Sequence, residues 1–224
     1  MGAFHQEEES RPPDLLRRVS SRVKTILLDL SWSRREREWR RARSVGNRVE
    51  GWLSPDQERW LFEQAYALPE EANIVEVGSF RGRSTCFLAS GCRGTKKKVF
   101  AVDTFDGEEK DFGYRGYLED FSRSVTRAGL SEYVQPLQGV SWEVAAAWDR
   151  PIHLLFVDGS HEYEDVLRDF RGFAPHVAPG GTIAFHDVEQ VWPGPLRAWH
   201  EEIKHQLIDI GYCSTLAHGH KAFR

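Results

Sequence analysis

Carboxylate and imidazole side chains follow two apolar segments in the second half of this 224-residue sequence. The segment 152–158 ends at Asp158, and the segment 182–187 ends at His186 and Asp187. A segment that is apolar up to its last residues is typical of a strand buried on both faces of a parallel sheet. Adjacent parallel strands lie about 4.8 Å apart, so side chains at their carboxyl ends can share one cation. We therefore predict a divalent metal site formed by Asp158, His186 and Asp187.

The mixed donor set leaves the metal open between Mg²⁺ and Mn²⁺. Mg²⁺ prefers carboxylate oxygens and water, whereas imidazole suits Mn²⁺, Fe²⁺ or Zn²⁺ better. The alternative interpretation is that His186 and Asp187 only hydrogen-bond each other or a loop backbone. Three residues after Asp158 comes His161, and an imidazole with an ordinary pKa of about 6.5 can take a hydroxyl proton at neutral pH. We predict catalytic roles for His161, as general base, and Asp158; the alternative for His161 is an N-cap of the following helix.

A second group of polar residues surrounds a glycine-containing turn within residues 73–85. A β-branched run stops at Gly78, Gly82 follows four residues later, and a helical pattern then begins. Glycines let a ligand approach the backbone, and the free N–H groups of a helix start attract an electron-rich group. Glu76 lies in the otherwise apolar run, where an unpartnered carboxylate is costly. Asp103 closes the next apolar run and is placed to hold ribose hydroxyls.

The spacing of the two glycines excludes two common nucleotide sites. It is not the Gly-x-Gly-x-x-Gly pattern of dinucleotide-binding folds, and no Lys-Ser/Thr pair follows it, as in triphosphate-binding loops. A nicotinamide-dependent dehydrogenase is therefore disfavoured. The simplest alternative is close packing of a strand on a helix, with no ligand at all.

The elements that must position these residues alternate along the chain. This order predicts an α/β fold, with a doubly wound, mostly parallel, seven-stranded Rossmann-like sheet and ligands at the carboxyl ends of its strands. A helix is expected from Pro55, with Ser54 as its N-cap and Gln57 completing a capping box. Strands are expected at 73–77, 99–103, 133–137, 152–158 and 182–187, with one or two more within 212–223. Helices are expected between them at 82–92, 121–128, 144–148, 163–177 and 196–208.

Four segments resemble, in order, the signature blocks of class I S-adenosylmethionine-dependent methyltransferases, and most of all the bacterial O-methyltransferases of sugars and natural products. The segments are IVEVGSFRGRST, VFAVDTFDG, LLFVDGSHEYEDVLRDF and APGGTIAFHDV. The resemblance covers residues 50–224. It implies metal ligands at the strand ends, with His186 where relatives often carry Asp or Glu. It also implies a donor site in which Glu76, Gly78, Ser79 and Gly82 line the methionine, Ser84 and Thr85 lie close by, Asp103 binds the ribose, and Ser141 and Trp142 flank the adenine.

The resemblance leads us to expect an O-methyltransferase that uses S-adenosylmethionine and a divalent cation on a hydroxyl of a small molecule or glycan precursor. One alternative is a metal-independent N- or O-methyltransferase with His161 as base, and another is a non-catalytic oligomerisation module of the same fold. Trp142 could instead be a plain core residue. Acceptor contacts are expected from residues 104–120 and 188–195. The side chains singled out there are Tyr114, Arg115, Tyr117 and Trp192.

Composition divides the chain into an extension, 1–48, and a donor-binding domain, 49–224. The extension is expected to be a disordered tip followed by a basic amphipathic helix, with 12 Lys/Arg against 7 Asp/Glu. That helix could pack on its own domain or a second subunit, rest on an anionic membrane, or bind a polyanion. The domain carries 18 Lys/Arg against 27 Asp/Glu, which argues against a nucleic-acid substrate. We expect a cytoplasmic protein, since no signal-peptide layout, apolar membrane span or cysteine pattern occurs. We also expect a homo-oligomer.

Overall fold

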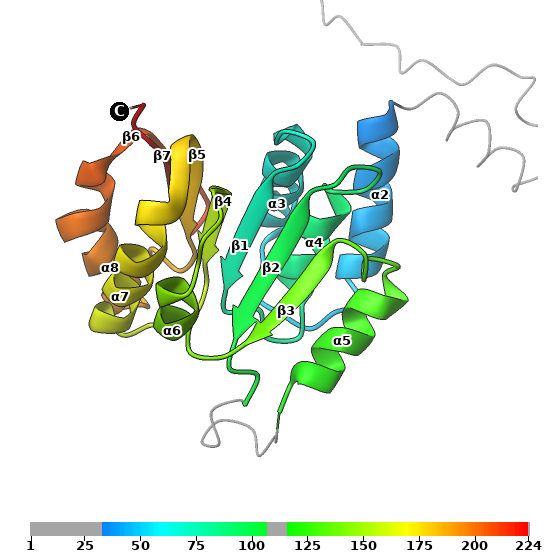
Figure 1. Cartoon of the computed structure of the whole chain (residues 1–224), viewed down its shortest axis with the longest axis horizontal. Helices are drawn as coiled ribbons and strands as arrows, with labels where there is room; N and C mark the ends of the chain where they lie inside the picture. Colours follow the sequence, from blue (N-terminus) through cyan, green and yellow to red (C-terminus); the bar gives the residue numbers. More distant parts are fainter. Residues whose placement is uncertain (1–32, 107–115, 224) are drawn as a thin grey trace, which may run out of the picture. The chain divides into compact units, whose positions relative to one another are not determined.

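The computed structural model describes residues 33–106 and 116–223. Its strands are β1 (Asn73–Val77), β2 (Lys98–Asp103), β3 (Val134–Gln138), β4 (Ile152–Val157), β5 (Val177–Phe185), β6 (Leu207–Cys213) and β7 (Leu216–Lys221). In the described residues they form one seven-stranded sheet of order β3-β2-β1-β4-β5-β7-β6 (Figure 1). The first five strands pair in parallel, and β7 runs antiparallel to β5 and β6. The predicted doubly wound, mostly parallel fold is confirmed.

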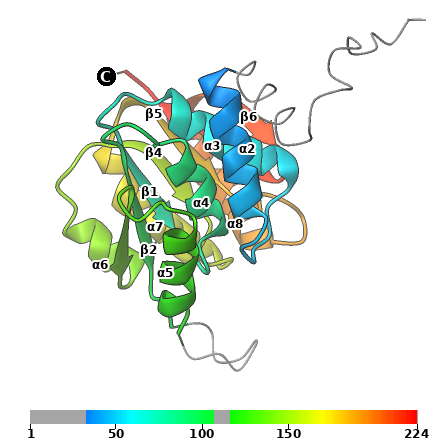
Figure 2. The same cartoon turned by 90° about the vertical axis from the view of Figure 1, so that its right-hand side faces the viewer.

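Helices cover both faces of the sheet. The α-helices are α2 (Arg34–Gly46), α3 (Pro55–Ala67), α4 (Arg83–Ser90), α5 (Leu118–Arg127), α6 (Ser141–Ala146), α7 (Tyr163–Phe173) and α8 (Pro193–Ala198). Figures 1 and 2 show α3, α4 and α5 on one face and α6, α7 and α8 on the other. Parallel strands joined by helical crossovers require this double cover, because both faces of the sheet are apolar.

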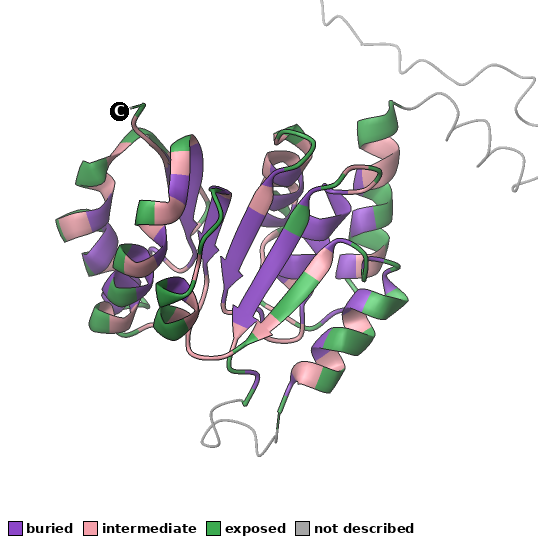
Figure 3. Ribbon diagram, in the orientation of Figure 1, coloured by how far each residue is buried: buried purple, intermediate pink, exposed green. Residues whose placement is uncertain are grey.

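Alternation along the central strands divides the interior into two cores. Ile74 and Val99 join the apolar cluster under α3, α4 and α5, whereas Val75 and Phe100 join the cluster under α6, α7 and α8. Successive side chains of a strand point to opposite faces, so the two neighbouring strands supply both cores in the same register. Figure 3 shows β1 and β4 buried almost throughout. The polar strand ends are thus held on a rigid centre.

The predicted capping box at the start of α3 is confirmed. The backbone N–H of Ser54 donates to Oε1 of Gln57 at 2.8 Å, and the N–H of Gln57 donates to the Ser54 hydroxyl at 3.4 Å. The other end of α3 is closed by Lys97, a buried ammonium group that donates to the carbonyls of Ala65 and Tyr66 and to that of Gly91, after α4. A cation at two helix C-termini is stabilised by the exposed carbonyl groups and the helix dipoles.

Several element boundaries differ from the predicted ones, most of all around β5 and α8. The helix expected to run to 177 ends at Phe173, and β5 begins at Val177, before the Pro179-Gly180-Gly181 sequence that was expected to separate them. The extra strand residues fit because the β4–β5 register shifts between Ile152 and Leu154. The helix expected over 196–208 consists of α8, a π-helical turn and a 3-10 turn, and its last two residues belong to β6. Antiparallel pairing with β7 overrides the helical pattern there.

The compact unit that carries the sheet runs from Glu38 to Arg224, so it begins ahead of the predicted boundary between 48 and 49. Within it, the Trp39 ring lies 5.5 Å from that of Phe62 and 5.9 Å from that of Phe87. Of the predicted basic helix, only the part from Arg34 onward lies within the described residues. No helix in the described parts of the chain is long and apolar enough to cross a membrane.

Candidate active site

The turn after β1 brings the two predicted groups of polar residues into direct contact. Gly78 adopts a φ of 84°, and a Cβ placed on it would lie 2.1 Å from the carbonyl oxygen of Asp158, at the end of β4. Gly82, with a φ of 90°, leaves room for the Phe121 ring, which a Cβ would approach to 3.1 Å. Glycine is needed at both positions because a side chain is strained at such φ values and, at Gly78, would collide with backbone. The β1 and β4 strand ends therefore form one continuous site.

Glu76 is fully buried beneath this turn. Its Oε2 accepts hydrogen bonds from the hydroxyls of Ser79, at 3.0 Å, and Thr85, while its Oε1 has no hydrogen-bond partner among the described residues. Ser84, in the first turn of α4, is also buried. Burial raises the pKa of Glu76 to about 7, although the neighbouring hydroxyls favour its charged form. A buried acceptor without a partner suits a ligand that brings a donor, since such an atom is costly to leave alone.

Asp103 organises the backbone of the glycine turn. Its Oδ2 accepts the N–H groups of Ser79 at 2.8 Å and Phe80 at 2.9 Å, and its Oδ1 accepts the N–H of Phe105 at 2.8 Å. Phe80 and Phe105 both have positive φ values, 45° and 56°. Such conformations are strained for aromatic residues and persist where surrounding bonds enforce them. The predicted ribose ligand thus has a structural role that sequence reasoning missed.

The predicted adenine residues follow β3, and one of them is bound to a buried acid. The Ser141 hydroxyl donates to Oδ1 of Asp169, a residue of α7 that is only 3% exposed. Burial raises the pKa of Asp169 to about 6. Trp142 is 39% exposed, and the Arg168 guanidinium lies 4.6 Å above its ring. The core interpretation of Trp142 is therefore wrong, and a guanidinium group stacks on its ring.

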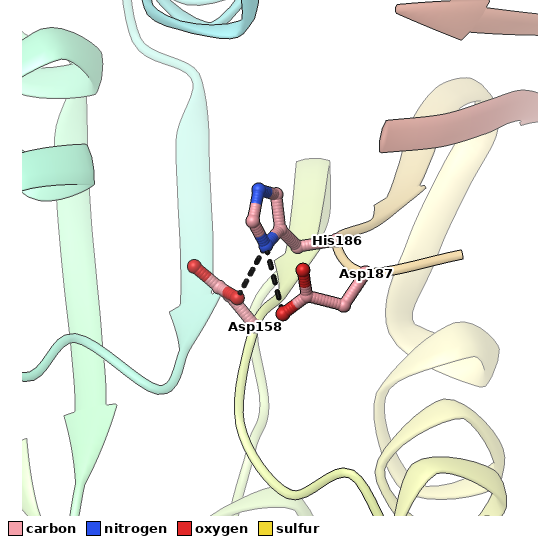
Figure 4. A group of neighbouring side chains, drawn as sticks. All are labelled: Asp158, His186 and Asp187. Carbon is pink, nitrogen blue, oxygen red and sulfur yellow. Dashed lines mark ion pairs between the residues drawn. The ribbon is translucent and has the colours of Figure 1, made fainter. Parts of the chain in front are cut away.

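Asp158, His186 and Asp187 converge at the ends of β4 and β5, as Figure 4 shows. Nδ1 of His186 lies 3.1 Å from Oδ1 of Asp158 and 3.1 Å from Oδ2 of Asp187. Each residue offers one donor atom, and the three atoms lie within 4.8 Å of one another. Neither ring nitrogen of His186 makes a well-formed hydrogen bond within the described residues, although the residue is only 6% exposed. Two carboxylates and one imidazole whose donor atoms lie this close together fit a divalent cation.

The charges of this cluster depend on one another. Burial acts to lower the pKa of His186, but Asp158 and Asp187 outweigh it and raise that pKa well above its usual range. Burial raises the pKa of Asp158, with the charge of His186 opposing the shift. For Asp187, burial is outweighed by His161 and His186, so its pKa is lowered. The raised pKa favours the imidazolium form of His186, which places a positive charge between the two carboxylates.

His161 is joined to the same cluster. Its Nε2 lies 2.9 Å from Oδ2 of Asp187, and its ring stacks on Trp192 with centroids 3.9 Å apart and planes inclined by 15°. His161 does not cap the helix that follows, because Glu162 occupies the N-cap position of α7 and no side chain makes a cap hydrogen bond there. The N-cap alternative is therefore wrong. A carboxylate bond and a stacked indole fix the orientation of the ring, which a general base requires.

Of the two predicted acceptor loops, 188–195 is described in full, whereas 104–120 is described only in part. Tyr114 and Arg115 lie outside the described residues. Tyr117 is only 7% exposed and packs edge-on against Phe80, with centroids 4.7 Å apart, so it supports the glycine turn. Trp192 is 37% exposed and lies beside His161.

The sequence profile of the methyltransferase domain matches residues 75–188, which is half of the chain and includes both strand-end clusters. The chain belongs to this methyltransferase domain family. The resemblance to class I S-adenosylmethionine-dependent methyltransferases noted in the sequence is confirmed.

Relatives of this methyltransferase share only part of their length with it. An uncharacterised protein, y4gI, of Sinorhizobium fredii is 32% identical over 122 residues, 52% of this chain and 13% of that protein. The O-methyltransferase hkm8 of Aspergillus hancockii is 30% identical over 116 residues, 51% of this chain and 42% of that enzyme. The chain thus spans less than half the length of these curated relatives.

A solved structure shares the whole fold at low sequence identity. The O-methyltransferase TomG of Streptomyces achromogenes, involved in tomaymycin synthesis and determined with S-adenosylmethionine, is 17% identical. The alignment covers 90% of this chain and 96% of TomG, with a TM-score of 0.59. At this identity the likeness supports the fold and no particular acceptor.

Proposed function

We propose that this methyltransferase transfers a methyl group from S-adenosylmethionine to a hydroxyl of a small molecule or glycan precursor. The observation that carries the proposal is the direct contact between the glycine turn and the Asp158 strand end. A donor held at the turn lies next to the carboxylates and imidazoles that can activate a hydroxyl. Proximity of this kind supplies several kcal/mol of the rate enhancement of such displacements.

The glycine-turn residues suit the donor for three reasons. The partnerless Oε1 of Glu76 suits an ammonium group, such as that of the methionine portion. Asp103 holds the turn in place with three backbone hydrogen bonds and retains lone pairs for hydroxyl groups. Trp142 is an exposed aromatic side chain of a type that suits a purine ring. When bound, S-adenosylmethionine supplies an electrophilic methyl group on a sulfonium centre.

The residues at the ends of β4 and β5 suit proton removal from the acceptor. His161 takes the hydroxyl proton, while Asp187 orients its ring and stabilises the imidazolium that forms. Asp158, His186 and Asp187 would hold a Mn²⁺ or Mg²⁺ ion, whose charge lowers the pKa of a bound hydroxyl. The oxygen then attacks the methyl carbon in line with the departing sulfur, which leaves with its bonding electrons as a neutral thioether. Trp192 offers the acceptor an aromatic surface beside His161.

The test combines donor binding with turnover. We expect S-adenosylhomocysteine to bind the full chain by calorimetry, and trideuterated S-adenosylmethionine to label a hydroxylated acceptor from a panel of sugars and phenols. EDTA should lower the rate, and Mn²⁺ or Mg²⁺ should restore it. Absence of S-adenosylhomocysteine binding would refute the donor assignment and favour a non-catalytic module.

A metal-independent reaction is a second candidate, favoured by one observation. A protonated His186 side chain brings positive charge between Asp158 and Asp187, so part of the negative charge of the two carboxylates is offset without an ion. In that case His161 and Asp187 act alone as a base and its orienting carboxylate, on an oxygen or nitrogen acceptor. An unchanged rate in EDTA, together with loss of activity in His161→Ala, would select this alternative.

A further inference from the structure

A cavity of about 520 Å³ lies between the end of α2, residues 48–50 and α5. None of the residues that line it belongs to the donor, base or metal groups described above. Its charged lining consists of four arginines and two acids, namely Arg48, Arg81, Arg123, Arg127, Glu50 and Asp120. The volume is within the usual range for a small-molecule site, about 300–1,000 Å³.

The charges in this cavity are only partly balanced. Arg123 pairs with Asp120 at 2.5 Å, and Arg81 pairs with Glu50 and lies 3.7 Å from Asp120. Within the described residues, the guanidinium groups of Arg48 and Arg127 have no hydrogen-bonding or acidic partner. The lining therefore carries a net charge of +2, whereas residues 49–224 as a whole are acidic. A cationic hollow on an acidic domain attracts anions, because its walls concentrate the field.

We propose that this cavity binds a soluble small molecule carrying a phosphate or diphosphate group, with Arg48 and Arg127 as its main contacts. Guanidinium groups bind phosphate oxygens in a bidentate, planar geometry, and those of Arg48 and Arg127 are in no ion pair within the described residues. A long polyanion or a flat anionic membrane would bring phosphate groups close to Glu50 and Asp120 in the lining. The repulsion from these two carboxylates disfavours both ligands. The proposal does not depend on methyl transfer, since the donor residues are a separate set.

Calorimetry with inorganic pyrophosphate on the full chain tests the proposal at physiological ionic strength. We expect saturable binding that weakens at least about tenfold in Arg48→Ala/Arg127→Ala. The matched control is Arg171→Ala/Lys204→Ala, which removes two positive charges outside the cavity and should bind as the original chain does. Both variants should keep their affinity for S-adenosylhomocysteine, which separates this site from the proposed donor site. Arg48→Lys/Arg127→Lys, which keeps the charge and should keep the fold, should bind at intermediate strength because Lys lacks the planar fork.

Three outcomes would overturn the proposal. The first is no pyrophosphate binding at concentrations up to about 1 mM. The second is equal weakening in the cavity variant and the control variant, which would mean that net charge alone is responsible. The third is binding only to RNA or to phosphatidylglycerol vesicles, lost in the cavity variant, which would identify a macromolecular surface.

Discussion

The two halves of the candidate active site differ in how completely their polar groups are satisfied. Around the glycine turn, both oxygens of Asp103 accept backbone N–H groups, and one oxygen of Glu76 accepts two hydroxyls. At the ends of β4 and β5, the buried His186 ring touches two carboxylates but lacks a well-formed hydrogen bond. Apart from Oε1 of Glu76, the polar groups of the first half are therefore satisfied by the chain itself, whereas the His186 ring nitrogens of the second half lack hydrogen bonds within the described residues.

The largest effect should come from the second half. Asp158→Ala should lower the rate of methyl transfer by about 10²–10⁴-fold, because it removes a carboxylate from the cluster that activates the acceptor. Affinity for S-adenosylhomocysteine should stay within about threefold of the original, since Asp158 supplies only its backbone to the glycine turn. Glu164→Ala, at an exposed acid on α7, is the matched control. Normal turnover in Asp158→Ala would remove the distinction between the halves.

A pair of glycine substitutions tests how tightly the halves are joined. Gly78→Ala should cost about 3 kcal/mol or more of unfolding free energy and impair donor binding, because its Cβ would collide with the Asp158 backbone. Gly82→Ala should cost only about 1–2 kcal/mol, because an aromatic ring 3.1 Å away can shift. Urea unfolding of both variants gives the comparison. Equal losses of unfolding free energy in the two variants would show that the contact between the ends of β1 and β4 is loose.

The pH dependence of stability should single out Glu76. Its pKa is raised from 4.5 to about 7 by burial, so the folded chain binds a proton more tightly than the unfolded chain. The contribution of Glu76 to stability is therefore greatest below about pH 4.5 and falls as the pH rises to about 7, by up to about 3 kcal/mol. The difference in stability between the original chain and Glu76→Gln, measured by urea unfolding from pH 4.5 to 8, should change over this window. A constant difference would contradict the raised pKa.

The smallest effect should come from Asp103→Ala. Loss of three hydrogen bonds should cost about 2 kcal/mol of unfolding free energy, since each bond of this kind contributes about 0.5–1.5 kcal/mol net. Calorimetry with S-adenosylhomocysteine should show binding weakened about tenfold, because the turn loses its anchor and the ribose loses an acceptor. Asp103→Asn, which keeps one carbonyl oxygen, should recover part of both losses. Unchanged affinity in Asp103→Ala would refute the ribose assignment.

The sequence predicted the sheet well because strand and helix periods alternate clearly from residue 73 onward. It also identified the strand-end acids, since a carboxylate after an apolar run is uncommon without a partner. It could not predict that Asp103 binds the turn backbone, or that Trp192 stacks on His161, because both contacts join segments that only the folded chain brings together. Asp169 carried a signal that was overlooked. It lies on the apolar stripe of α7 between Val166 and Phe173, where an acid calls for a buried partner.

The burial of the Lys97 ammonium group between two helix ends has a consequence for chemical labelling. Lys97 stands between Lys96 and Lys98, both exposed, yet its own ammonium is held by three carbonyl groups at the ends of α3 and α4. Amine-reactive reagents should therefore modify its two neighbours rapidly and reach Lys97 only when the two helix ends separate. Because the three lysines are adjacent, mass spectrometry can compare the modification rate of Lys97 with the rates of Lys96 and Lys98. The ratio of these rates reports how often the two helix ends separate.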